Sequence, residues 1–76
     1  MIDRKIFSER LKRLRKERGL TIVDIADALS IIKQSVHTWE NMKTIPTLDR
    51  AAALADLLGV SLDYLTGRTD KPEVNR

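Results

Sequence analysis

Residues 21–41, TIVDIADALSIIKQSVHTWEN, decide the fold of this chain. In the first half of the stretch, apolar residues recur at the three- and four-residue spacing that places them on one helical face. Residues 30–32 interrupt this spacing, which then resumes around Val36 and Trp39. The pattern predicts two short helices joined by a tight turn, each of which buries only one side.

The second of these helices, residues 33–41, carries polar side chains opposite its predicted buried stripe, counted at 100° per residue. On this outward face and at its margin lie Lys33, Gln34, His37, Thr38 and Asn41. Amide, hydroxyl, imidazole and ammonium groups of this kind hydrogen-bond base edges or phosphate oxygens in nucleic acids. The sequence therefore indicates a candidate surface for reading nucleic acid.

Several further segments carry a family resemblance, and they need no insertion or deletion between them. They are ERLKRLRKERGLT, the alanine and leucine of DIADAL, SVHTWEN, the proline and threonine of IPTL, and ALADLLGVSLDYLTG. With these segments, residues 7–67 resemble the small helix-turn-helix domains of phage repressors and Cro proteins, the xenobiotic-response-element family. The resemblance implies an all-α fold, a compact five-helix domain over residues 1–67. Residues 68–76 are polar and without periodicity, so we expect a flexible C-terminal tail.

The resemblance also implies which side chains contact DNA, because in such domains the start of the second helix of the motif enters the major groove. The predicted DNA-binding residues are Thr21, Lys33, Gln34, Ser35, His37, Thr38, Asn41 and Lys43. Gln34 is the main candidate for direct readout, since a glutamine amide can bond adenine at both N6 and N7. Asn41 and Lys43 match family positions near the phosphate backbone, where contacts fix register without reading sequence.

A second implication of the resemblance concerns the orientation of the reading helix. In the family, the arginine that matches Arg15 pairs with the glutamate that matches Glu40. A bidentate pair of guanidinium and carboxylate would hold the first helix against the third. We expect its role to be architectural.

Four positions depart from the family pattern. Ile22 stands where a phosphate-binding glutamine is common, Ser30 where the turn often has glycine, and Met42 where glycine often follows the third helix. We expect Ser30 to adopt a less easy backbone conformation or a different turn, and the stop after the third helix to shift onto Asn41.

Ile32, the fourth departure, replaces the usual serine or threonine N-cap, and three interpretations are open. Its side chain can contact a thymine methyl group in the major groove. It can belong to an exposed apolar patch with Ile22 and Val23 that binds protein. It can also be core, as we expect for its neighbour Ile31.

The rest of the chain supplies the supporting helices. Asp3, Thr21, Thr47 and Ser61 are predicted N-caps, and the fourth helix is expected over residues 48–58. The expected core includes either Ile6 or Phe7, together with Leu11, Leu14, Trp39, Leu48, Leu54, Leu57, Leu58, Val60, Leu62 and Leu65. Tyr64 is expected to be partly exposed and available to an interface.

Composition limits the function classes. The 76 residues fit one small domain, whose modest stability would gain from forming a homodimer. Cysteine is absent, and the single histidine has no paired carboxylate at ligand spacing, so we expect no metal, no cofactor and no enzyme activity. No apolar run exceeds five residues, so we expect no membrane span and a cytoplasmic location.

The net charge of +3 is unevenly distributed. Residues 1–20 hold eight basic and three acidic side chains. This basic helix can contact phosphates and steer DNA toward the protein, or it can be an ordinary solvated face. Asp24 and Asp27 give the second helix an acidic outward face, which is either solubilising or open to a partner protein.

The sequence thus predicts a transcriptional regulator, a repressor that binds double-stranded DNA at a pseudo-palindromic operator as a homodimer. A protein partner controlling its activity is possible. The alternative is a protein-interaction module, such as an antitoxin or an antirepressor partner, with the same fold.

Overall fold

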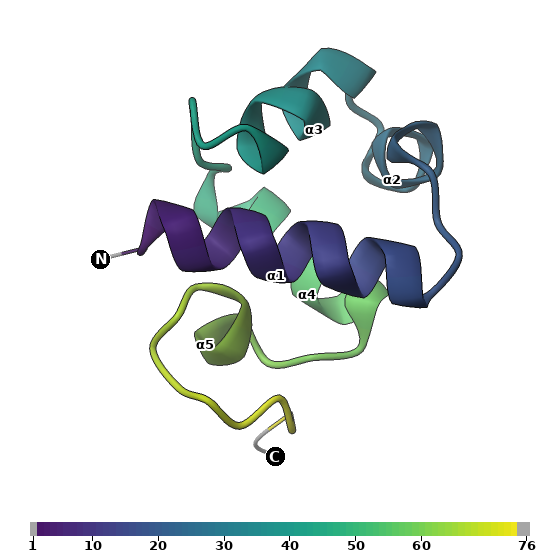
Figure 1. Cartoon of the computed structure of the whole chain (residues 1–76). Helices are drawn as coiled ribbons and strands as arrows, with labels where there is room; N and C mark the ends of the chain where they lie inside the picture. The colour runs from purple at the N-terminus through teal and green to yellow at the C-terminus, as the bar shows by residue number, and fades with distance from the viewer. Residues whose placement is uncertain (1, 75–76) are drawn as a thin grey trace.

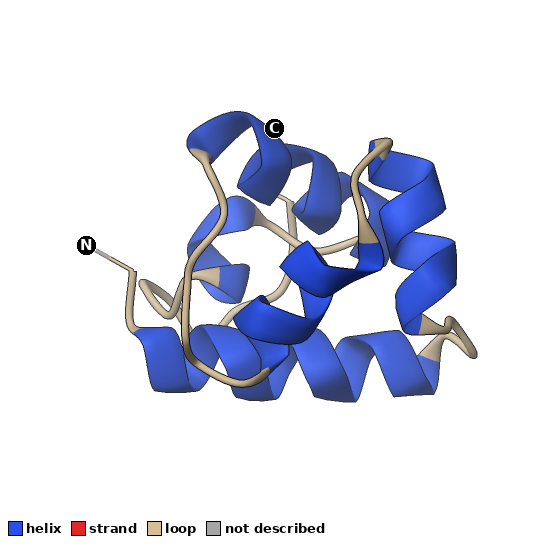
Figure 2. Ribbon diagram, turned by 90° about the horizontal axis from the view of Figure 1, so that it is seen from above, coloured by secondary structure: helices blue, strands red, loops and turns tan. Residues whose placement is uncertain are grey.

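Five helices follow one another along the part of the chain that the structure, a computed structural model, describes, which is residues 2–74 (Figure 1). They are α1 (Arg4–Glu17), α2 (Ile22–Leu29), α3 (Lys33–Glu40), α4 (Leu48–Leu58) and α5 (Leu62–Leu65). Over these residues the ribbon consists of helices and loops alone, as Figure 2 shows. The predicted all-α, five-helix fold is confirmed. The first residue of the predicted domain and the last two of the predicted tail lie outside the described residues.

Short side chains begin most of these helices. The predicted N-caps, whose side-chain oxygens accept from first-turn backbone N–H groups, are Asp3, Thr21, Thr47 and Ser61. Thr21 and Asp24 form a reciprocal capping box, which satisfies two otherwise unpaired donors of α2. By contrast, Ile32 begins α3 without a side-chain cap hydrogen bond.

Two turns in the central motif require left-handed backbone from residues other than glycine. Ser30, after α2, has φ 56° and ψ 44°, which confirms the less easy conformation expected there. Met42 has φ 61°, whereas Asn41 has φ −98°. The expected shift of the stop onto Asn41 is therefore wrong, because Met42 itself takes the position that glycine would occupy. Left-handed backbone costs an L-residue about 1 to 2 kcal/mol.

A single apolar core joins the helices. Its largest fully buried side chains are Phe7, Leu11, Ile25, Val36, Leu54, Leu58 and Leu65. Two predicted core residues are wrong: Leu48 is 73% exposed and Leu57 is 38% exposed. Leu57 lies about 100° around α4 from the buried Leu58, and Leu48 lies in the first turn at the margin of the stripe.

In the view of Figure 1, α1 lies between two groups of elements, and in Figure 2 it runs along one edge of the molecule. In Figure 1, α2 and α3 lie on one side of it, while α5 and the C-terminal segment lie on the other. α3 packs against α1 and α2, and α5 packs against α1 and α4. The helix-turn-helix pair is thereby held on the side of α1 opposite the C-terminal segment.

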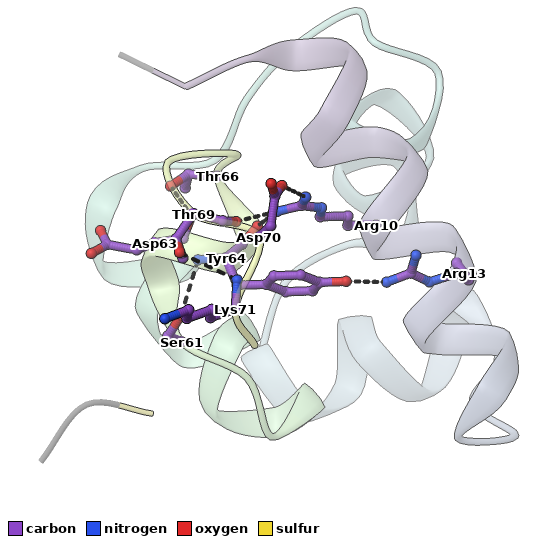
Figure 3. Close-up of polar contacts among 9 residues, drawn as sticks. All are labelled: Arg10, Arg13, Ser61, Asp63, Tyr64, Thr66, Thr69, Asp70 and Lys71. Atoms are coloured by element: carbon purple, nitrogen blue, oxygen red, sulfur yellow. Dashed lines mark hydrogen bonds and ion pairs between the residues drawn. The ribbon is translucent and has the colours of Figure 1, made fainter. Parts of the chain in front are cut away.

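Tyr64 joins α5 to α1. Its side chain is buried, at 8% exposure, so the expected partial exposure is wrong. The Arg10 guanidinium stacks over its ring at 4.0 Å from the centroid, and Arg13 donates a hydrogen bond to its hydroxyl (Figure 3). These contacts cover the ring with two arginines from a helix that is 51 residues or more away in the sequence.

The first residues of the predicted tail also contact the folded body. Arg10 donates to the carbonyl oxygen of Thr69 at 2.8 Å and to the carboxylate of Asp70 at 3.2 Å (Figure 3). The backbone N–H of Ser61 donates to the carbonyl oxygen of Pro72 at 2.9 Å. These contacts join residues 69–72 to α1 and to the residue before α5. The flexibility of residues 68–76 stays a prediction.

Candidate nucleic-acid interface

The inner side of α3 is fixed by core packing. Val36 is fully buried, and Trp39 is 3% exposed, as predicted. These side chains share one face because α3 is an α-helix of eight residues, with about 3.6 residues per turn. Glu40 is buried as well, whereas Lys33, Gln34 and His37 are exposed on the opposite side.

An ion pair holds α3 against α1. The Nε of Arg15 donates to Oε2 of Glu40 at 2.6 Å, and Nη2 donates to Oε1 at 3.2 Å. The third guanidinium nitrogen, Nη1, donates to the carbonyl oxygen of Leu20 at 3.0 Å. The two side chains are 13% and 4% exposed. The bidentate pair implied by the family resemblance is confirmed, and it ties α3 both to α1 and to the loop that precedes α2.

The outer side of α3 and the loop after it hold most of the predicted DNA-binding residues. Lys33, Gln34, His37, Asn41 and Lys43 are all exposed. In residues 2–74, none of these five side chains takes part in a hydrogen bond or an ion pair. Their donors and acceptors are therefore available to an external partner.

Two other predicted residues are half-buried rather than exposed. Ser35 and Thr38 lie between the outer face of α3 and the loop that leads to α4. The Thr38 hydroxyl donates to the carbonyl oxygen of Ser35 at 2.8 Å and hydrogen-bonds the Thr44 hydroxyl at 2.7 Å. Thr38 thus has a structural task, which is to attach the loop after α3 to the helix.

Thr21 is set apart from the other predicted site residues. It precedes α2, and its hydroxyl oxygen accepts from the backbone N–H of Asp24 at 3.0 Å. The side chain is exposed, so it can still meet a phosphate, but its oxygen already caps a helix.

Three residues that the sequence interpretation missed lie beside the outer face. A cavity of about 340 Å³ is lined by Gln34, Ser35, Thr38 and Trp39 of α3 together with residues 44–47 and Arg50. Thr44, Thr47 and Arg50 thereby join the candidate interface. The exposed Arg50 forms no ion pair in the described part of the chain, and a guanidinium suits phosphate oxygens. A basic residue in the first turn of the helix after the loop was the signal available in the sequence.

The surroundings of this interface include exposed apolar side chains. Ile32 is 70% exposed, so the interpretation of Ile32 as core is wrong, whereas Ile31 packs against the core as expected. Val23 is 50% exposed, but Ile22 is partly buried against the core. The proposed apolar patch is therefore reduced to the exposed parts of Val23 and Ile32.

Several basic residues of α1 have internal partners. Arg10 and Arg13 contact Tyr64, Arg15 pairs with Glu40, and Arg18 donates to the carbonyl oxygen of Leu58 at 2.7 Å. Lys5, Lys12 and Lys16 are exposed. These four arginines therefore stabilise the fold, and the exposed Arg4 and the lysines of α1 remain for steering or solvation.

Metal sites and membrane spans each have a characteristic pattern of residues. Nowhere in residues 2–74 do three or more histidine, cysteine, aspartate or glutamate side chains gather in a way that could hold a metal ion. None of the described helices is long and apolar enough to cross a membrane.

The chain is similar in sequence to known proteins. A family model described as helix-turn-helix matches residues 11–65. The uncharacterized HTH-type transcriptional regulator YobD of Bacillus subtilis is 38% identical over 68 residues, which make up 90% of this chain and 61% of YobD. The 26 kDa repressor protein of Escherichia phage HK022 is 32% identical over 72 residues, with 90% of this chain and 31% of the repressor covered.

A solved structure shares the fold over most of the chain. The crystal structure of SinR, described as the master regulator for biofilm formation in complex with DNA, has a TM-score of 0.69 and 27% identity. The match covers 78% of this chain and 95% of SinR. The chain thus spans nearly the whole of that structure, but less than two thirds of the two curated relatives.

Proposed function

The chain belongs to the helix-turn-helix family of transcription regulators that includes phage repressors, a family of DNA-binding proteins rather than enzymes, and on this premise we propose that it is a sequence-specific repressor. It binds a pseudo-palindromic operator in double-stranded DNA as a homodimer, with α3 in the major groove. The observation that carries this proposal is the contrast across α3. Core packing and the ion pair between Arg15 and Glu40 fix its inner side, while the exposed polar groups of its outer side have no internal partner.

Base readout falls to the start of α3. In domains of this type the N-terminal residues of the second helix of the motif contact base edges. Gln34 is exposed there, and its amide can donate to N7 of adenine and accept from N6. Lys33 can donate to guanine O6 and N7 or to a phosphate, and His37 lies one turn further along the same helix.

Phosphate contacts come from the end of α3 and the start of α4. Asn41 and Lys43 follow α3, and Arg50 lies in the first turn of α4 beside the cavity that Gln34 also lines. Contacts of this kind position the protein and release condensed counterions, so affinity falls steeply with salt. Thr21 at the start of α2 would add a contact on the other side of the motif.

A homodimer explains how such a small domain gains sufficient affinity. Two copies would bind half-sites about 34 Å apart on one face of the duplex. Within residues 2–74, Leu48 is the most exposed of the large apolar side chains, and it borders a cavity of about 270 Å³ that Ile2, Pro46 and Leu62 also line. This apolar end of the domain is available to a second copy. Repression then follows because the bound homodimer occupies a promoter. A cytoplasmic location is part of the proposal, because the DNA that the homodimer binds lies there.

Selection of bound sites from a random duplex library at physiological salt tests the proposal. The native chain is compared with Gln34→Ala and with a control variant, Asp56→Asn, whose exposed side chain lies on α4. The expected result is a two-fold-symmetric motif for the native chain and the control, with preference lost at matching positions for Gln34→Ala. Salt-sensitive binding without any motif would contradict it.

One observation favours a second candidate, a protein-interaction module. The exposed Val23 lies on α2 next to the exposed Asp24, with Asp27 one turn further along. An acidic helix face with an apolar residue suits a basic protein partner, which can also be a partner that controls the regulator. Binding to a protein that is lost in Val23→Ser and retained in Gln34→Ala would support this candidate.

A further inference from the structure

The start of α3 differs from the other helix starts in the described part of the chain. Asp3, Thr21, Thr47 and Ser61 each accept a hydrogen bond from a first-turn N–H group. Ile32 has the same extended backbone as these caps, with φ −79° and ψ 149°, but its side chain has no acceptor. The geometry at this position suits serine or threonine, so the isoleucine sacrifices helix stability.

Burial does not compensate for the missing cap. Ile32 is 70% exposed, whereas its neighbour Ile31 packs against the core. The side chain of Ile32 therefore gives the folded chain neither a cap nor a share of the core. Single exposed apolar side chains are common on protein surfaces, but this one also occupies a cap position where a polar side chain would stabilise the helix.

The position of Ile32 indicates what that contact is. It directly precedes Lys33 and Gln34, at the end of α3 that enters the major groove under the proposed function. The apolar group that the major groove presents is the C5-methyl group of thymine. Gln34 suits adenine, so a site read by Gln34 already contains A·T pairs near the start of the helix.

We propose that Ile32 is a specificity-determining residue, which packs on the C5-methyl group of a thymine next to the base pair that Gln34 reads. This inference rests on the proposed function and names a second element of its specificity. Because the side chain of Ile32 adjoins the exposed polar groups of α3, its partner is DNA rather than a protein.

Replacing thymine by uracil in the duplex recovered by selection tests the inference, because uracil lacks only the methyl group. Affinities are measured for the full chain with the unmodified duplex and with duplexes in which symmetry-related thymines are replaced in turn. For the native chain, one replacement should weaken binding about fourfold per half-site, the affinity equivalent of one buried methyl group.

The variant Ile32→Ser separates recognition from folding. Serine restores an N-cap, so the thermal midpoint should rise while affinity for the unmodified duplex falls by the same factor. The uracil replacement should then have no further effect. Val23→Ser, which removes another exposed apolar side chain, is the control and should respond to uracil as the native chain does.

Three results would overturn the inference. The native chain could be insensitive to every uracil replacement, Ile32→Ser could retain the full uracil penalty, or Ile32→Ser could have a lower thermal midpoint. In each of these cases a selected motif that depends on Gln34 would leave the proposed function intact. Absence of any motif with the native chain would instead overturn both, and the two failures are thereby distinguished.

Discussion

The two sides of α3 differ in how their polar groups are satisfied. On the inner side, the carboxylate of Glu40 receives two hydrogen bonds from Arg15, and the surrounding side chains are buried. On the outer side, Lys33, Gln34 and His37 are exposed and have no internal partner within residues 2–74.

Under the proposed function, stability and recognition are carried by opposite sides of one eight-residue helix. A fixed inner side holds the outer groups in one orientation, so that a base contact does not have to order the helix first. Substitutions should therefore separate into those that change folding and those that change binding.

Glu40→Ala should cause the largest loss of stability. It leaves the Arg15 guanidinium unpaired and only 13% exposed, at a cost of about 3 to 5 kcal/mol in the free energy of unfolding. A domain of this size can lose most of its native population from such a change. Urea denaturation followed by circular dichroism measures the effect. Glu9→Ala, at an exposed position of α1, is the control. A loss of less than about 1 kcal/mol for Glu40→Ala would contradict a stabilising role for the pair between Arg15 and Glu40.

Gln34→Ala should change binding and leave folding intact. We expect it to remove about 1 to 3 kcal/mol of discrimination at one base pair of each half-site. The free energy of unfolding should stay within about 0.5 kcal/mol of the native value, because the side chain is exposed. Titrations with the selected duplex and its single-base variants measure the discrimination. Equal losses on all duplexes would contradict a base-reading role for Gln34.

Ser30→Gly and Met42→Gly should each stabilise the domain by about 1 kcal/mol. Both residues have left-handed backbone, which glycine adopts without steric cost. Ala53→Gly, in the exposed interior of α4, is the matched control and should destabilise by about 1 kcal/mol. Thermal unfolding measures all three changes. Destabilisation by glycine at position 30 or 42 would show that the native side chain makes a compensating contact.

Lys43→Ala should have the smallest effect and should act through salt. Removal of one phosphate contact per half-site weakens binding about equally for all DNA sequences and lowers the slope of log affinity against log salt by about 1 for each half-site. Affinities measured across a salt series give this slope. Lys71→Ala, in the exposed segment after α5, is the control and should leave the slope unchanged. An unchanged slope for Lys43→Ala would remove Lys43 from the interface.

Local patterns in the sequence were sufficient to predict much of this molecule. The caps at Thr21, Thr47 and Ser61 depend on residues three positions apart, and α4 begins and ends where its cap and Gly59 predict. The inward position of Trp39 follows from helical periodicity. The pair between Arg15 and Glu40, 25 residues apart, came from the family resemblance rather than from any local pattern.

Features that depend on distant contacts were not predicted. Tyr64 is buried because Arg10 and Arg13, from the other end of the chain, cover its ring. Leu48 matches the helical pattern of a core residue, but whether another helix reaches it depends on packing that periodicity does not contain. Arg50 was missed because only the folded loop brings the start of α4 beside Gln34.

The most direct test of the two-sided account is to map the bound surface by backbone amide chemical-shift changes on titrating the chain with the selected duplex. The account predicts that the largest changes cluster in residues 32–50, with small changes in the outward face of α2 around Asp24 and Asp27. Changes centred on α2 instead, with residues 33–43 unaffected, would contradict the assignment of recognition to the outer side of α3.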